Sequence, residues 1–130
     1  MDLGEDGWLY DEVLCDSFTV NNPDYYHQLF ANFRINSDYS FANIQVKLTL
    51  INPDSTQISF PLSIPLAEKS GKWLGSGFGS VKTYQVPILH RKLLNQSGSY
   101  HLRLEQNMRL ENLSNVLSAG MRVDEQEEIF

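Results

Sequence analysis

The feature that most constrains the fold is an alternation of apolar and polar residues along most of the chain. It is clearest in residues 43–51, where the apolar side chains fall on one face of an extended segment: Ile44, Val46, Leu48 and Leu50. A half-buried β-strand has this period of two, whereas a helix has a period near 3.6. The sequence NPDST follows, in which Pro53 and Asp54 favour a turn, and residues 57–64 then alternate again. Residues 43–64 are therefore predicted to form a β-hairpin.

The same rule predicts further strands at 13–20, 26–35, 82–89, 99–106 and 119–125. Segment 26–35 carries aromatic residues on both faces, which favours burial on both sides. About seven or eight short strands separated by turns are typical of an all-β, antiparallel sandwich of two sheets, Ig-like or jelly-roll. Residues 108–117 have helical spacing, so at most one short helix is expected. The chain is predicted to be a single domain, 1–130, with flexible ends at 1–7 and 125–130.

Two prolines and the single cysteine make specific structural predictions. Pro61 and Pro87 fall inside predicted strands, and proline cannot donate to a ladder, so each is predicted at a sheet edge or a bulge. Cys15 lies in an apolar strand beside acidic neighbours. It is therefore predicted to be buried and unreactive, and one cysteine allows no disulfide framework.

The composition and the motifs exclude several functional classes. A net charge of −6 opposes binding to nucleic acid, and no stretch approaches the length of a membrane-spanning helix. The glycines of LGSGFGS match neither a dinucleotide-binding nor a P-loop pattern, and a strand rather than a helix follows them. The histidines are scattered, without metal-ligand spacing: His27, His90 and His101. No catalytic residue, metal site or cofactor is predicted, and the protein is interpreted as a non-enzyme.

Aromatic residues in two predicted loops are the candidate binding surface: Trp73, Phe78, Tyr39 and Phe41. Large apolar side chains on a loop either cap the core or contact a partner such as a protein or a glycan. For Trp73 the first interpretation is favoured. Its indole is predicted to anchor the glycine-rich loop, with the ring buried and its N–H donated to a backbone carbonyl.

Several separated motifs, in order, resemble one known family. They are YHQLFANFRINSDYSFANIQVKLTLINPD, then FPLSIPLAEKSGKWLGSGFGSVKTYQVPI, then SGSYHLRLEQNMR. This pattern, from about Trp8 to about Asp124, is similar to the gliding-motility lipoprotein GldH family of Bacteroidota. Its most specific part is Gly71-Lys72-Trp73-Leu74-Gly75, followed by Tyr84, Gln85 and Pro87.

The resemblance implies an exported cell-envelope lipoprotein, periplasm-facing or in the outer membrane, needed for gliding and linked to type IX secretion. Its expected partners are other envelope proteins of that machinery, and the family brings no catalytic residues to this chain. Cys15 follows no apolar leader, so the lipid-bearing cysteine is expected upstream and absent from this chain, and membrane attachment would occur only through that lipid. The alternative function is a carbohydrate-binding domain that stacks sugars on loop aromatics.

Overall fold

The computed structural model describes residues 1–21, 26–77, 79–89 and 96–126, with the backbone alone for residues 26, 89, 125 and 126. Within these residues there are nine strands and no helix. The strands are β1 (Trp8–Leu9), β2 (Leu14–Val20), β3 (Tyr26–Asn36), β4 (Asn43–Ile51), β5 (Gln57–Pro65), β6 (Val81–Leu89), β7 (Gly98–Gln106), β8 (Asn112–Leu113) and β9 (Val116–Gln126).

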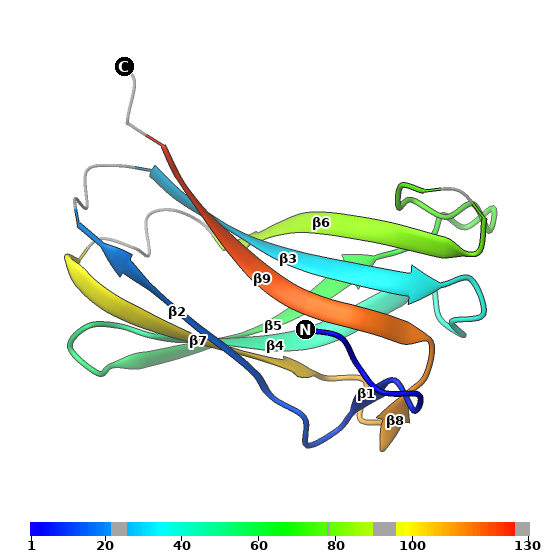
Figure 1. The fold of residues 1–130 in the computed structure, drawn as a ribbon, viewed down its shortest axis with the longest axis horizontal. Coiled ribbons are helices and arrows are strands. Elements are labelled where there is room, and N and C mark those ends of the chain that lie inside the picture. The colour runs from blue at the N-terminus through cyan, green and yellow to red at the C-terminus, as the bar shows by residue number, and fades with distance from the viewer. Residues whose placement is uncertain (22–25, 78, 90–95, 127–130) are drawn as a thin grey trace.

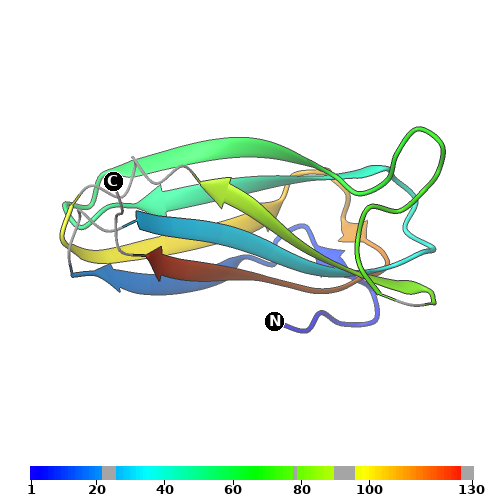
Figure 2. The ribbon, with the colours of Figure 1, turned by 90° about the horizontal axis from the view of Figure 1, so that it is seen from above.

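Two antiparallel sheets face each other as the layers of a sandwich (Figures 1 and 2). One sheet has the order β2-β7-β4-β5 and the other the order β6-β3-β9, while β1 and β8 form a short third pair. The predicted all-β sandwich is therefore confirmed. The alternating residues of β4 are fully buried, as predicted, and they face the equally buried row on β3: Leu29, Ala31, Phe33 and Ile35.

Both prolines lie on edge strands, as predicted. Among the described strands, β5 with Pro61 in its middle pairs with β4 alone, and β6 with Pro87 pairs with β3 alone. Opposite Pro87 the register shifts between Leu29 and Phe30. In both sheets the proline, which has no amide hydrogen, therefore lies on a strand at the edge of the sheet, where one side needs no hydrogen bonds to a further strand.

The helix predicted for residues 108–117 is wrong. This segment contains β8, a turn and the start of β9. Arg109 and Asn115 have positive φ values of 61° and 70°, which a right-handed helix does not allow. The apolar residues share no helical face, because Leu113 and Val116 are buried while Leu110 is exposed.

Burial of β3 on both sides is also not observed. Its second row faces away from the core: Gln28, Phe30, Asn32 and Arg34. Gln28 and Arg34 are exposed, and Phe30 is only partly buried, with the guanidinium of Arg122 lying 4.9 Å from its ring centre. The outer face of this sheet is thus open and mostly polar.

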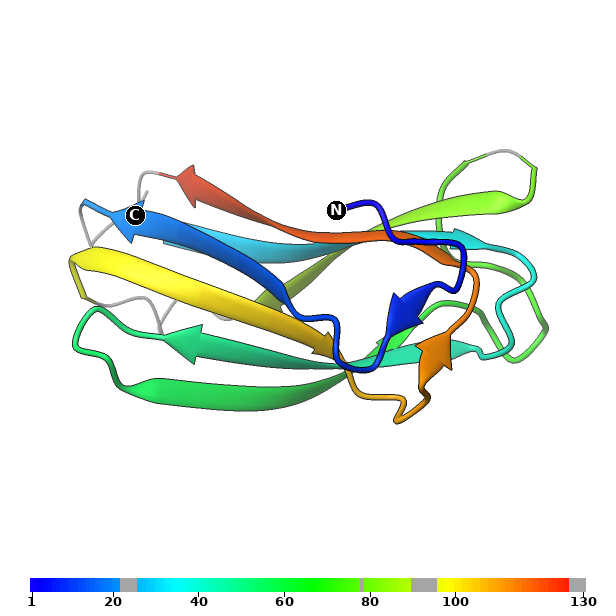
Figure 3. The same cartoon turned by 60° about the horizontal axis from the view of Figure 1, so that its bottom comes forward.

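The N-terminal segment crosses the side of the sandwich that faces the viewer in Figure 3. Trp8 is completely buried, pairs with Leu113 of β8, and lies with its ring centre 6.3 Å from that of Phe33. Its indole N–H donates to the backbone oxygen of Glu12 at 2.8 Å. Gly7, with φ of 81°, comes so close to Leu113 that a Cβ would lie 2.0 Å from the Leu113 carbonyl oxygen. A buried tryptophan and a required glycine therefore fix this segment.

Residues 1–7, expected from the sequence to be a flexible end, pair with the edge of β9. The Leu3 amide donates to the Leu117 oxygen at 2.9 Å, and the Ala119 amide donates to the Met1 oxygen at 3.1 Å. The segment covers the first part of β9, so that this edge has a partner along residues 117–119. Residues 127–130 at the other end lie outside the described residues.

The prediction that Cys15 is buried is wrong, because its side chain is exposed. Leu14 and Val20 are the buried residues of β2, and Cys15 lies on the opposite face, paired with Arg103 of β7. The sequence pattern thus predicts the strand correctly, but it does not predict which face of the strand packs against the core.

We expect Cys15 in the native protein to react with a maleimide about as fast as in the unfolded chain, because its side chain is exposed. Mass spectrometry of the labelled native protein, with and without urea, measures both rates. Labelling only in urea would contradict the exposed position.

Candidate functional site

The loop from residue 66 to residue 80 is tied to the loop from 37 to 42 at one end of the sandwich, on the right of Figure 1. The Leu66 amide donates to the Ala42 oxygen at 2.8 Å, and the Ser37 amide donates to the Ser80 oxygen at 2.6 Å. Within the longer loop, the Leu74 amide returns to the Leu66 oxygen at 2.8 Å. The loop is thus held by backbone hydrogen bonds at its base and at its centre.

Trp73 is partly buried and packs against the core. The predicted hydrogen bond from its indole is not formed with any described residue, so that part of the anchor interpretation is wrong. Tyr84 provides a deeper anchor: it is buried, and its hydroxyl donates to the Leu66 oxygen at 2.8 Å. Gly75 is needed here, because a Cβ at this position would lie 2.7 Å from the Tyr84 ring.

The other predicted aromatic residues occupy different environments. Tyr39 is buried, its hydroxyl donates to the Asn43 oxygen at 2.9 Å, and burial raises its pKa. Phe41 is 38% exposed and lies with its ring centre 5.6 Å from that of Tyr39, edge to face. Phe78 lies outside the described residues. At this loop end the exposed apolar surface therefore comes from Phe41 and from Leu74, which is 48% exposed.

A second apolar surface was not predicted. We define the β1–β8 patch as Leu9, Tyr10 and Leu110, which are 37%, 55% and 38% exposed. Leu9 and Tyr10 line a depression of about 360 Å³ together with three polar residues: Asp11, Glu111 and Asn112. The Tyr10 amide donates to the Glu111 oxygen at 3.0 Å, which brings the two chain segments together. The patch thus has an acidic rim.

The described residues contain no group of three or more histidine, cysteine, aspartate or glutamate side chains that could hold a metal ion. His27 is buried, His101 is exposed, and His90 lies outside the described residues. Asp54 has a lowered pKa because the hydroxyl and amide of Thr56 donate to it, which is the geometry of a turn. The lowered pKa of Asp54 therefore follows from its turn.

No helix long and apolar enough to span a membrane occurs in the part of the chain that the structure describes. The fold and its surfaces define a class: a β-sandwich domain with exposed apolar surface at the loop end and at the β1–β8 pair.

Comparison with known proteins identifies the family. Residues 1–123 match the family described as GldH lipoprotein, and the chain belongs to it. It is 28% identical to the gliding motility lipoprotein GldH homolog of Christiangramia forsetii, over 90% of this chain and 76% of that protein. It is 22% identical to the gliding motility lipoprotein GldH of Flavobacterium johnsoniae, over 92% of this chain and 79% of that protein. No solved structure matches. Membership of a lipoprotein family implies association with the cell envelope.

Proposed function

We propose that this domain is a non-enzymatic component of the gliding-motility and type IX secretion machinery that binds other envelope proteins. The observation that carries the proposal is the family match over residues 1–123. Two relatives named as gliding motility lipoproteins support it. As a lipoprotein of this family, the domain would lie in the periplasm or at the outer membrane.

The β1–β8 patch is the contact surface in this proposal. Tyr10 and Leu110 are large apolar side chains that are 55% and 38% exposed, and burying them against a partner is favourable. Asp11 and Glu111 at the rim remain beside water and favour a partner with basic residues around an apolar centre. Trp8, immediately below, is fully buried and gives the patch a rigid base.

A capture experiment with envelope extract from the native organism tests this proposal. We expect Tyr10→Ser with Leu110→Ser to lose the proteins that crosslink to the wild-type domain, because both apolar contacts are removed. Ile58→Ser is the control, since this side chain is 37% exposed and lies on the edge strand β5, away from the β1–β8 pair. The control is expected to capture the same proteins as the wild type.

Two results would contradict the proposal. Unchanged capture by the Tyr10/Leu110 variant would exclude the β1–β8 patch. Loss confined to Phe41→Ser with Leu74→Ser would place the contact at the loop end, where the sequence had predicted it. Thermal melting of each variant shows whether a loss of capture reflects unfolding.

A further inference from the structure

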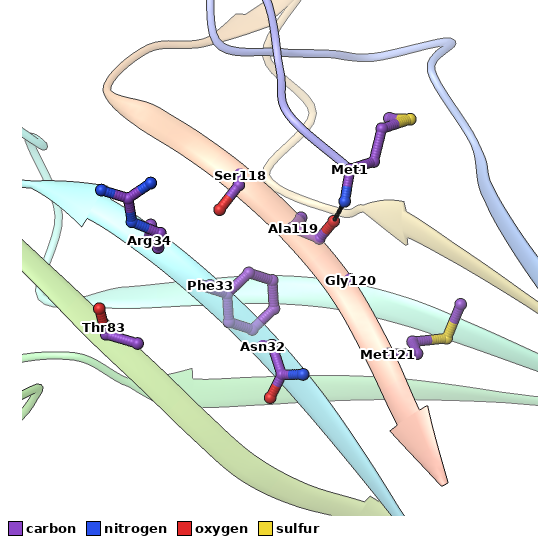
Figure 4. Close-up of a pocket in the computed structure, with 9 residues that line it drawn as sticks. All are labelled: Met1, Asn32, Phe33, Arg34, Thr83, Ser118, Ala119, Gly120 and Met121. Carbon is purple, nitrogen blue, oxygen red and sulfur yellow. Dashed lines mark hydrogen bonds between the residues drawn. The ribbon is translucent and has the colours of Figure 1, made fainter.

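The outer face of the β6-β3-β9 sheet has a depression of about 360 Å³. Figure 4 shows the residues around it, with Asn32 and Arg34 from β3, Thr83 from β6 and Ser118 from β9. The register places them on one face, because Arg34 is opposite both Thr83 and Ser118. Gly120 is opposite Asn32 and lines the depression. Because glycine has no side chain, it leaves this part of the sheet surface unfilled.

Two polar groups here lack partners within the described residues. The Asn32 Oδ1 atom is buried and accepts no hydrogen bond, although buried polar atoms are usually satisfied. The guanidinium of Arg34 is exposed and makes neither an ion pair nor a hydrogen bond with a described residue. Arg122, on the same face, differs in that its Nη2 lies 3.0 Å from the Asp124 carboxylate. The depression therefore contains the Asn32 oxygen, which accepts no hydrogen bond, and the Arg34 guanidinium, whose N–H groups donate none to a described residue.

We propose that this depression binds an uncharged glycan. A sugar hydroxyl donates and accepts at once. One hydroxyl can accept from the exposed Arg34 guanidinium, and another can donate to the Asn32 oxygen once the Asn32 amide turns that buried atom toward the depression. The two residues are two positions apart on one strand, about 6.6 Å, so separate hydroxyls of one oligosaccharide can reach both side chains. The Thr83 and Ser118 hydroxyls add two further groups that can donate or accept.

Charge favours a neutral sugar over an acidic one. The protein carries a net charge of −6, which repels a polyanion. Asp2 pairs with Ser118 through a β-bridge, so an acidic residue lies on the segment next to β9 at this side of the sheet.

Titration calorimetry with a panel of neutral oligosaccharides (cello-, laminari-, xylo- and chito-oligomers) tests the site, with oligogalacturonate as the acidic probe. We expect at least one neutral oligomer to bind and oligogalacturonate to bind more weakly. Asn32→Ala is expected to weaken binding about 3- to 10-fold through the loss of a hydrogen bond. Gln45→Ala, which removes an exposed amide from β4 on the other sheet, is expected to leave the affinity unchanged.

Gly120→Val is the second variant. Gly120 does not have a positive φ, and a Cβ there would meet its nearest neighbour, the Met1 nitrogen, at an ordinary 3.7 Å. Valine is therefore expected to fold, with a melting temperature close to that of the wild type, and to fill the depression, so that binding falls more than about 10-fold. Three results would overturn the proposal: no binding of any neutral oligomer, tighter binding of oligogalacturonate, or unchanged affinity in a folded Gly120→Val protein. Each can occur while envelope proteins are still captured through the β1–β8 patch, so this test is independent of the proposed function.

Discussion

Trp8→Ala is expected to lower the free energy of unfolding by about 3–5 kcal/mol, the usual cost of removing a fully buried large aromatic side chain. The ring is completely buried, packs near Phe33, and donates its N–H to the Glu12 oxygen. Loss of the ring leaves a cavity behind the short β1–β8 pair, in which Trp8 is opposite Leu113. Urea unfolding followed by circular dichroism measures the change.

Trp73→Ala is the matched comparison, because it removes the same side chain from a partly buried position without a hydrogen bond to the described residues. The free energy of unfolding is expected to fall by about 1–2 kcal/mol, because the Trp73 side chain has a smaller area removed from water. Equal losses in the two variants, or a larger loss at Trp73, would show that the glycine-rich loop rather than the N-terminal segment holds the main aromatic anchor.

Gly7→Ala is expected to destabilise the domain by about 3 kcal/mol or more. A φ of 81° costs an alanine about 1–2 kcal/mol. The added Cβ would also lie 2.0 Å from the Leu113 carbonyl oxygen, a backbone atom that can move only if β1 separates from β8, and such overpacking costs about 1–3 kcal/mol.

Gly71→Ala separates these two contributions. Its φ of 88° is similar, but a Cβ there has no heavy atom within 4 Å, so only the cost of the backbone conformation, about 1–2 kcal/mol, is expected. Comparison of the two unfolding midpoints gives the cost of the steric contact. The same loss in both variants would mean that the close approach of Gly7 to β8 does not constrain the fold.

The longer strands were predictable because each repeats its pattern often enough to reveal its period. Residues 43–51 alternate over nine positions, and the structure buries the predicted face. The edge positions of Pro61 and Pro87 followed from the missing amide alone. Cys15 shows the limit of this reasoning, because a strand pattern with few apolar residues does not determine which face meets the core.

The closing pair β1–β8 was not predictable in the same way. Each strand has two residues, too few to show a period, and acidic residues around Trp8 suggested a solvated end. The combination predicted for Trp73, a buried ring whose N–H donates to a backbone carbonyl, occurs instead at Trp8 in the N-terminal segment. Trp8 itself was the available signal, because a tryptophan is rarely left in a solvated tail.

The candidate sites depend on positions that are distant in sequence. Leu9 and Tyr10 are far from Glu111 along the chain and meet it only because β1 pairs with β8. Asn32 and Gly120 are opposite each other only because β3 pairs with β9. Registers of this kind come from the packing of the whole sandwich, and no local pattern in the sequence contains them.

The strand order determines when the domain can fold during synthesis. Among the residues that the structure describes, β2 pairs with β7 alone, and the second edge of β3 pairs with β9 alone, the last of these strands. A nascent chain that ends before residue 98 can form the β4–β5 hairpin and the β3–β6 pair, but it leaves β2 without a neighbour. Pairings over such sequence separations are slow to form, on a scale of milliseconds to seconds. Until residues 116–126 are available, β3 keeps an open edge beside its apolar inner face, and such an edge favours association of incomplete chains.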